Sequence, residues 1–187
     1  MSSQPYNRYS STAIVLHWVM AVLMLGNIVL IWIVDELPDE RVRLAIDTHK
    51  SIGITVMGLF VLRLLWRLAH RPPALEDLAP WERWAAKLGH IGLYALLLAM
   101  PLSGWLHDSA WKDAATHPMS LFGLVPWPRI GYIMSMEPGL KEQLHSLFGA
   151  AHEWLGNLFY LLFALHVIGG LKHQFLDRQK MLQRMWF

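Results

Sequence analysis

The chain of 187 residues contains no cysteine. Disulfide bonds, iron–sulfur clusters and metal sites built on thiolates are therefore excluded. Charge is also scarce, because Asp, Glu, Lys and Arg make up 16% of the chain, against about 25% in an ordinary soluble domain. The formal net charge of +2 is too small to create the field that nucleic-acid binding requires. We therefore expect no nucleic-acid partner.

Apolar residues are correspondingly abundant. Hydrophobic residues make up 55% of the chain, and the mean hydropathy is +0.32. Four apolar segments are each long enough to cross a hydrocarbon core about 30 Å thick, and only helices satisfy their own backbone in lipid at such a length. We predict an all-α membrane protein, a four-helix transmembrane bundle in contact with lipid and forming a single domain over 1–187. The transmembrane helices are expected at about 12–34, 49–68, 88–106 and 144–171, with a long outer loop at 108–143.

The positions of lysine and arginine predict the orientation of this bundle. With the N-terminus inside, ten of these residues flank the inner ends of the four segments and six flank the outer ends. Positive residues favour the cytoplasmic side, so both termini are predicted to be cytoplasmic. The inner residues are Arg8, Arg63, Arg67, Arg71, Arg83, Lys87, Lys172, Arg178, Lys180 and Arg184, and the outer residues are Arg41, Arg43, Lys50, Lys112, Arg129 and Lys141.

Two histidines in the last apolar segment carry the strongest functional signal. His152 and His166 are fourteen residues apart, which in an α-helix is a rise of about 21 Å and places both within about 40° of one face. Ionisable side chains at membrane depth are rare and usually functional, and imidazole is the commonest metal ligand among side chains. The spacing therefore suggests two haems held in a column along one helix.

Two further histidines match these depths. His17 lies five residues inside the inner end of the first segment, and His166 lies five residues before the inner end of the last. His49 and His152 both lie at the outer starts of their helices. We therefore predict two bis-histidine sites, with His17 and His166 at the inner iron and His49 and His152 at the outer iron. Without cysteine, these haems must be non-covalent b-type groups, two per chain.

The third apolar segment offers an alternative ligand. His90 and His107 are seventeen residues apart, which leaves them about 100° apart around a helix, so they cannot both face one haem column. His90 remains an alternative ligand for the inner iron, and its other expected role is a hydrogen bond to a haem propionate or to a facing helix. The histidines could also be structural polar groups bonded between helices.

Cations near the two layers are candidate partners for the haem propionates. They are Arg41, Arg43 and Lys50 on the outer side, and Arg63 and Arg67 on the inner side. Contact with lipid phosphates and a role in topology are the competing interpretations for each of them.

The motifs around these histidines resemble the bacterial cytochrome b-561 family. The matching strings are Arg8-Tyr9, Leu16-His17-Trp18, His49-Lys50-Ser51-Ile52-Gly53-Ile54, Pro101-Leu102-Ser103-Gly104-Trp105, His152 with His166, and Lys172-His173-Gln174-Phe175. The resemblance implies a multi-pass protein of the bacterial inner membrane that transfers electrons through two b haems. It also implies His17, His49, His152 and His166 as the axial ligands.

The resemblance leaves two functions open. In the first, the protein is a di-haem cytochrome that moves electrons between the periplasmic face and the quinone pool, as a superoxide:ubiquinone oxidoreductase. Arg41, Arg43 and Lys50 would then attract the small anion to the outer haem. In the second, it is a non-enzymatic relay subunit that docks a periplasmic or dehydrogenase partner. The loop at 108–143 would then be the landing surface.

Overall fold

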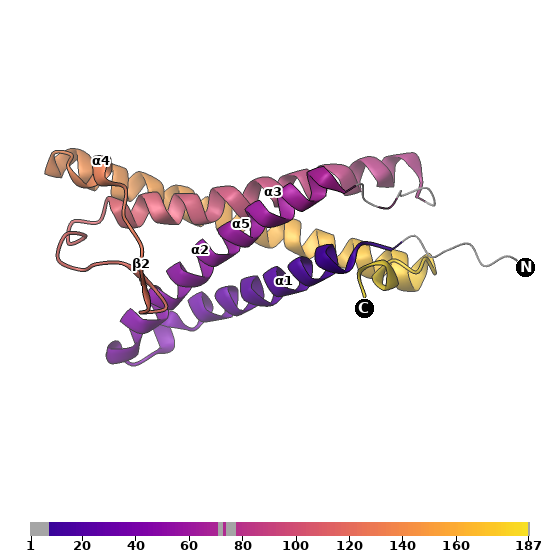
Figure 1. Ribbon diagram of the computed structural model, residues 1–187, viewed down its shortest axis with the longest axis horizontal. Coiled ribbons are helices and arrows are strands. Elements are labelled where there is room, and N and C mark those ends of the chain that lie inside the picture. Colours follow the sequence, from indigo (N-terminus) through magenta and orange to yellow (C-terminus); the bar gives the residue numbers. More distant parts are fainter. Residues whose placement is uncertain (1–7, 71–72, 74–77, 187) are drawn as a thin grey trace, which may run out of the picture.

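Four long helices dominate the computed structural model, which describes residues 8–70, 73 and 78–186 (Figure 1). They are α1 (Ser11–Trp32), α2 (Asp39–Ala69), α3 (Pro80–Ser109) and α5 (Pro138–Leu171). Each is long and apolar enough to cross a membrane. The predicted all-α membrane fold with four transmembrane helices is therefore confirmed.

α2, α3 and α5 begin well before the apolar segments that predicted them, whereas α1 matches its segment to within two residues. Local signals at the helix starts, rather than hydrophobicity, set where these three helices begin. α2 begins at Asp39, directly after Pro38, and carries acidic residues in its first turn, where they complement the helix dipole. α3 begins at Pro80, and the Glu82 carboxylate accepts a hydrogen bond from the Ala79 N–H at 3.2 Å. α5 begins at Pro138, and the side chain of Glu137 accepts from the Leu140 N–H at 3.0 Å.

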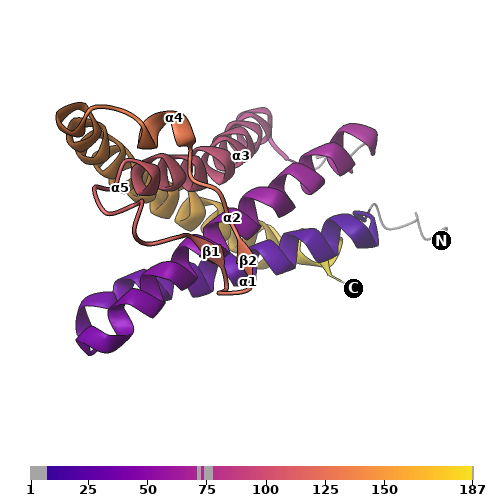
Figure 2. The same cartoon turned by 60° about the vertical axis from the view of Figure 1, so that its left-hand side comes forward.

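The bundle consists of two helix pairs. α1 packs along α2, and α3 packs along α5, while α2 and α3 connect the pairs (Figures 1 and 2). α5 has no comparable packing against α1 or α2. α5 therefore meets α1 and α2 through side chains rather than through close backbone packing, as where Trp32 contacts Tyr160 with ring centroids 5.8 Å apart.

The interior is small and the outside of the bundle is apolar. A cluster of Met20, Val56 and Phe60 is buried where α1 and α2 meet. Large aliphatic side chains are exposed along all four long helices, among them Val22, Leu65, Ile91 and Leu161. Since soluble proteins rarely expose a continuous apolar surface of this extent, lipid covers this surface.

Both ends of the described chain lie at the same end of the bundle (Figure 1). The Tyr9 N–H donates to the Arg184 carbonyl at 3.2 Å, and the Trp18 Nε1–H donates to the Met185 carbonyl at 2.6 Å. We refer to this as the inner end. The opposite end, which carries the long loop, is the outer end. The compartment that each end faces stays a prediction, and Arg71, which contributes to the charge balance, lies outside the described residues.

The loop at the outer end is folded. It contains the antiparallel pair β1 (Ser120–Leu121) and β2 (Val125–Pro126), followed by the short helix α4 (Gly131–Met134). The turn between the strands places Gly123 at a φ of 71°, which glycine adopts without strain. The Phe122 N–H donates to Ser51 Oγ on α2 at 2.9 Å, so the loop is attached close to His49.

Short helical turns complete the chain. η1 (Val34–Glu36) joins α1 to α2. A π-helical turn, η2 (Lys172–Leu176), continues α5, and η3 (Leu182–Met185) lies near the C-terminus. Turns of the π type are frequent at functional sites, and this one places Lys172 and His173 beside the start of α3.

Candidate haem sites

The outer layer brings together His49 of α2 and His152 of α5. Their ring centroids are 6.0 Å apart and the ring planes are 84° apart. Both residues are half-buried, and their rings join α2 of one helix pair to α5 of the other.

The inner layer brings together three histidines rather than two. The ring centroids of His17 and His166 are 6.3 Å apart, with 72° between the planes. His90 of α3 also lies beside His166, with the centroids 5.5 Å apart. The sequence left His17 and His90 as competing partners of His166, and the fold places both beside it.

The separations test whether these rings fit a haem iron. An imidazole nitrogen binds a transition metal at about 2.0–2.1 Å, and the ring centroid lies about 1.1 Å behind it, so two imidazoles on opposite sides of one ion have centroids about 6.2–6.4 Å apart. The separations of the pairs His49–His152 and His17–His166 are close to this range. The pair His90–His166 is too close.

Hydrogen bonds also distinguish His90 from His17, His49 and His166. His90 Nδ1 is bonded to the Ala86 carbonyl of its own helix at 2.7 Å. In the described part of the chain, His17 and His166 make no hydrogen bond, and the buried Nδ1 of His49 has no partner. Buried polar atoms are nearly always partnered, so the unpartnered Nδ1 of His49 in an apolar bundle fits a residue that binds a further group. The residues present therefore fit two haems.

His152 is held more firmly than the other rings. Its Nδ1 lies 3.1 Å from the Met100 carbonyl and 3.0 Å from Ser103 Oγ, both on α3. The close approach depends on Gly104, since a Cβ there would lie 3.1 Å from His152 Cε1. These contacts use Nδ1 and leave Nε2 for a metal.

The predicted outer cations already have carboxylate partners. Arg43 Nε contacts Asp47 at 2.9 Å. Lys50 Nζ contacts Asp108 at 2.6 Å and Asp47 at 3.5 Å. Arg41 is exposed and makes no ion pair with any described residue. Part of the positive charge that the sequence places at this end is therefore neutralised within the protein.

The predicted inner cations lie on one face of α2. Arg63 Nε donates to the Tyr94 hydroxyl at 3.2 Å, and the Arg67 guanidinium lies 5.9 Å from the Tyr94 ring centroid. Arg63 is also close enough to His17 and His166 to interact with them electrostatically. In the described chain Arg63 has no carboxylate partner, so its charge remains available to an anionic group.

Sequence reasoning missed a buried ion pair that fixes the outer loop. Arg129 Nε contacts Asp108 at 2.7 Å, and the two side chains are only 4% and 5% exposed. The same guanidinium donates to the carbonyls of Ala114 and His117. No periodic signal relates a lone arginine in a loop to an aspartate at a helix end, so only the fold could reveal this pair.

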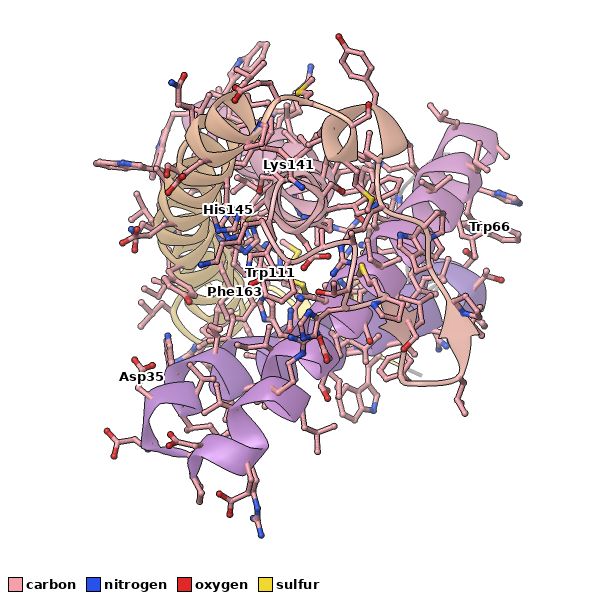
Figure 3. All side chains as sticks on the ribbon, turned by 90° about the vertical axis from the view of Figure 1, so that its left-hand side faces the viewer. Asp35, Trp66, Trp111, Lys141, His145 and Phe163 are labelled. Atoms are coloured by element: carbon pink, nitrogen blue, oxygen red, sulfur yellow. The ribbon has the colours of Figure 1, made fainter. Side chains whose placement is uncertain are left out.

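A second missed feature lies directly outside the outer layer. His107 and His145 are stacked, with centroids 3.9 Å and planes 16° apart. The Nδ1 of each bonds to the carbonyl of the other, at 2.8 and 3.0 Å. Figure 3, which looks at the outer end, shows His145 in the interior of the bundle and Asp35 at its edge. The reciprocal bonds hold α3 and α5 together beside His152.

Charged residues also connect α3 and α5 at the inner end. Lys172 Nζ contacts Glu82 at 2.6 Å and Asp177 at 2.7 Å. Asp177 accepts hydrogen bonds from Lys172 and from His173, and these bonds hold the pKa of its carboxyl below the usual value. Glu82, His173 and Asp177 could hold a metal ion by their spacing, but the Lys172 ammonium already occupies the space between the two carboxylates.

Comparisons with known proteins agree with this architecture. The family model for prokaryotic cytochrome b561 matches residues 8–187. "Cytochrome b561 homolog 2" of Escherichia coli K12 is 35% identical over 181 residues, covering 95% of this chain and 90% of that protein. "Cytochrome b561 homolog 1" of the same organism is 28% identical, covering 96% and 97%. The "Probable superoxide oxidase CybB" of Yersinia pestis is 26% identical, covering 96% of each chain.

The family match spans nearly the whole chain, and both histidine layers lie within it. The match implies binding of haem b and electron transfer in a bacterial membrane, in agreement with the fold and with the chemistry of the rings. The chain therefore belongs to the prokaryotic cytochrome b561 family.

Proposed function

We propose that this chain carries two b haems and moves electrons across the bacterial inner membrane, between the periplasmic face and the quinone pool. The observation that carries the proposal is the pair of histidine couples, His49–His152 and His17–His166, with centroids 6.0 and 6.3 Å apart in two layers of one bundle. These four histidines are the proposed axial ligands, two for each iron.

The residues of the site favour electron transfer over chemistry at the metal. A haem with imidazole on both axial positions supplies a one-electron carrier and no open position for oxygen. The bundle contributes rigid placement, since His152 is bonded to α3 through Nδ1. The cations of α2, above all Arg63, are the proposed partners for propionates at the inner layer.

We propose further that the outer layer faces the periplasm and that both termini are cytoplasmic. The support is the excess of Lys and Arg at the end of the bundle where both ends of the chain meet. A reporter enzyme that is active only in the periplasm, fused after Phe187, should be silent. Activity of this fusion would reverse the orientation and with it the assignment of the layers.

The proposed reaction is the oxidation of superoxide by ubiquinone. Two superoxide ions each release one electron and leave as O2, while one ubiquinone takes up both electrons and two protons to become ubiquinol. The name of the Yersinia pestis relative favours this activity. Lys50 follows His49 in the chain, and Arg41 is exposed in the first turn of α2. Both favour the approach of a small anion to the outer end, although Asp108 and Asp47 reduce the field of Lys50.

The second candidate is an electron relay for a periplasmic or dehydrogenase partner. The feature that favours it is the folded outer loop, whose tip exposes Phe122, Leu124 and Val125, with Leu124 84% exposed. Isolated exposed apolar residues are common, but several on one rigid turn fit a landing surface.

Two measurements test these proposals. Quantitation of haem as the pyridine haemochrome should give two b haems per chain, and one haem or none would contradict the di-haem assignment. With purified protein in lipid, superoxide consumption should accelerate when ubiquinone is added. Absence of this acceleration, with both haems present and reducible by dithionite, would favour the relay.

A further inference from the structure

The two layers differ in how their histidines are hydrogen-bonded. Ser103 Oγ–H donates to the Met100 carbonyl at 2.8 Å, so the lone pairs of that hydroxyl remain for His152 Nδ1 at 3.0 Å. Ser103 is only 6% exposed, and water does not compete for this bond. When Nε2 binds a metal, Nδ1 carries the proton and donates it to Ser103 and Met100.

Such a hydrogen bond changes the basicity of the imidazole as well as its orientation. A histidine that donates its second N–H to an acceptor becomes a more basic ligand. A more basic axial ligand stabilises the oxidised iron and lowers its reduction potential. Neither His17 nor His166 makes such a bond in the described part of the chain, so the inner ligands have no equivalent effect.

The charged residues near the two layers also favour a lower reduction potential for the outer haem than for the inner haem. At the outer layer, the cation next to His49 is Lys50, and Asp108 neutralises it at 2.6 Å. At the inner layer, Arg63 donates to the uncharged Tyr94 hydroxyl and has no carboxylate partner among the described residues. A positive charge without a protein carboxylate beside it favours the reduced iron and raises the potential of the inner site, and a propionate paired with Arg63 would offset only part of this effect.

We propose that Ser103 is a positioning residue for His152, and that it makes the outer haem the lower-potential haem of the two. The difference directs electrons from the outer layer to the inner layer. This inference rests on the proposed ligands and adds a direction of transfer and a residue that sets it.

The test is a potentiometric titration of the visible spectrum of the purified protein in lipid. The parent should show two midpoint potentials, and Ser103→Ala should raise the lower one while both haems are retained. A tenfold loss of preference for the oxidised iron corresponds to a rise of 59 mV. Ser103→Thr, which keeps the hydroxyl, should restore the parent value.

A matched control is available on the same helix. Ser109 is fully buried, donates to the Trp105 carbonyl and accepts from the Ile130 N–H of the outer loop, but it makes no hydrogen bond to a histidine of the described chain. Ser109→Ala should leave both potentials unchanged. An equal shift in Ser109→Ala, or no shift in Ser103→Ala, would overturn the proposal.

Two further variants assign each midpoint potential to one of the two haems. Arg63→Gln should lower the higher potential and leave the lower one unchanged. His166→Ala should leave one haem with the lower potential, and a remaining haem with the higher potential would overturn the proposed direction. If the parent binds two haems and Ser103→Ala shifts neither potential, this inference is wrong while the proposed function stands. Fewer than two haems in the parent would contradict the proposed function as well.

Discussion

The imidazole rings of His49 and His152 face each other from α2 and α5, with centroids 6.0 Å apart and planes 84° apart. The inner pair is also close to perpendicular, at 72°. Perpendicular axial rings leave the iron d orbitals that interact with them nearly equal in energy. The arrangement therefore has a spectroscopic consequence that can be measured on the oxidised protein.

We predict that the ferric protein gives strongly anisotropic low-spin electron paramagnetic resonance signals from both haems. Parallel imidazole planes would instead give the ordinary rhombic low-spin signal. A high-spin signal from protein that retains two haems would mean that one iron lacks its second histidine, and the pairing of rings would then be wrong.

His152→Ala should remove the outer haem and His166→Ala the inner haem, each leaving the other site occupied. The two ligands are fourteen residues apart on one helix, a separation of about 21 Å, so the sites have no ligand in common. The haem content of each variant should fall by half, as measured by pyridine haemochrome. Complete haem loss from both variants would show that the layers do not fill independently.

His17→Ala should remove the inner haem, whereas His90→Ala should retain it. The reason is distance, because the rings of His17 and His166 are spaced for a metal between them and those of His90 and His166 are too close. The two variants are matched, since both lose one ring that contacts His166. The opposite result would make α3 the source of the ligand.

Asp108→Asn should strongly destabilise the outer end, because it leaves Arg129 buried without its counter-charge. Breaking a buried ion pair from one side costs about 3–5 kcal/mol. Asp47→Asn is the control, since Asp47 also contacts Lys50 but is 44% exposed, and exposed pairs contribute about 0–1 kcal/mol. Thermal unfolding of the two variants should rank them in this order, and equal midpoints would contradict it.

Asp177→Asn should destabilise the η2 turn that follows α5 at neutral pH but not in acid, because it removes the carboxylate that pairs with Lys172 and His173. Lys172 and His173 lower the pKa of the Asp177 carboxyl, so its stabilising contribution is present above the unfolded pKa and is lost as pH falls through the folded value. The difference in melting temperature from the parent should therefore shrink below the usual pKa of aspartate. Glu142→Gln, at a side chain without an ion pair in the described chain, should show no such trend, and a constant difference for Asp177→Asn would contradict the prediction.

Much of the fold could be predicted because the signals are local. The apolar segments identified four spanning helices, and the depths of His17, His49, His152 and His166 within them suggested two layers. Helix periodicity alone places His152 and His166 on one face. The starts of α2, α3 and α5 at Asp39, Pro80 and Pro138 were harder to predict, because turns outside the lipid carry little hydropathy signal and depend on capping contacts.

The sequence by itself determined which residues lie at which depth, since rise per residue and hydropathy are properties of a single helix. Only the tertiary structure decided which rings meet, because that depends on the rotation and separation of neighbouring helices. It placed His90 beside His166 as well as His17, paired Lys50 with Asp108, and brought the Ser103 hydroxyl to His152. Each of these contacts joins residues on different helices, and no pattern within one helix specifies its neighbour.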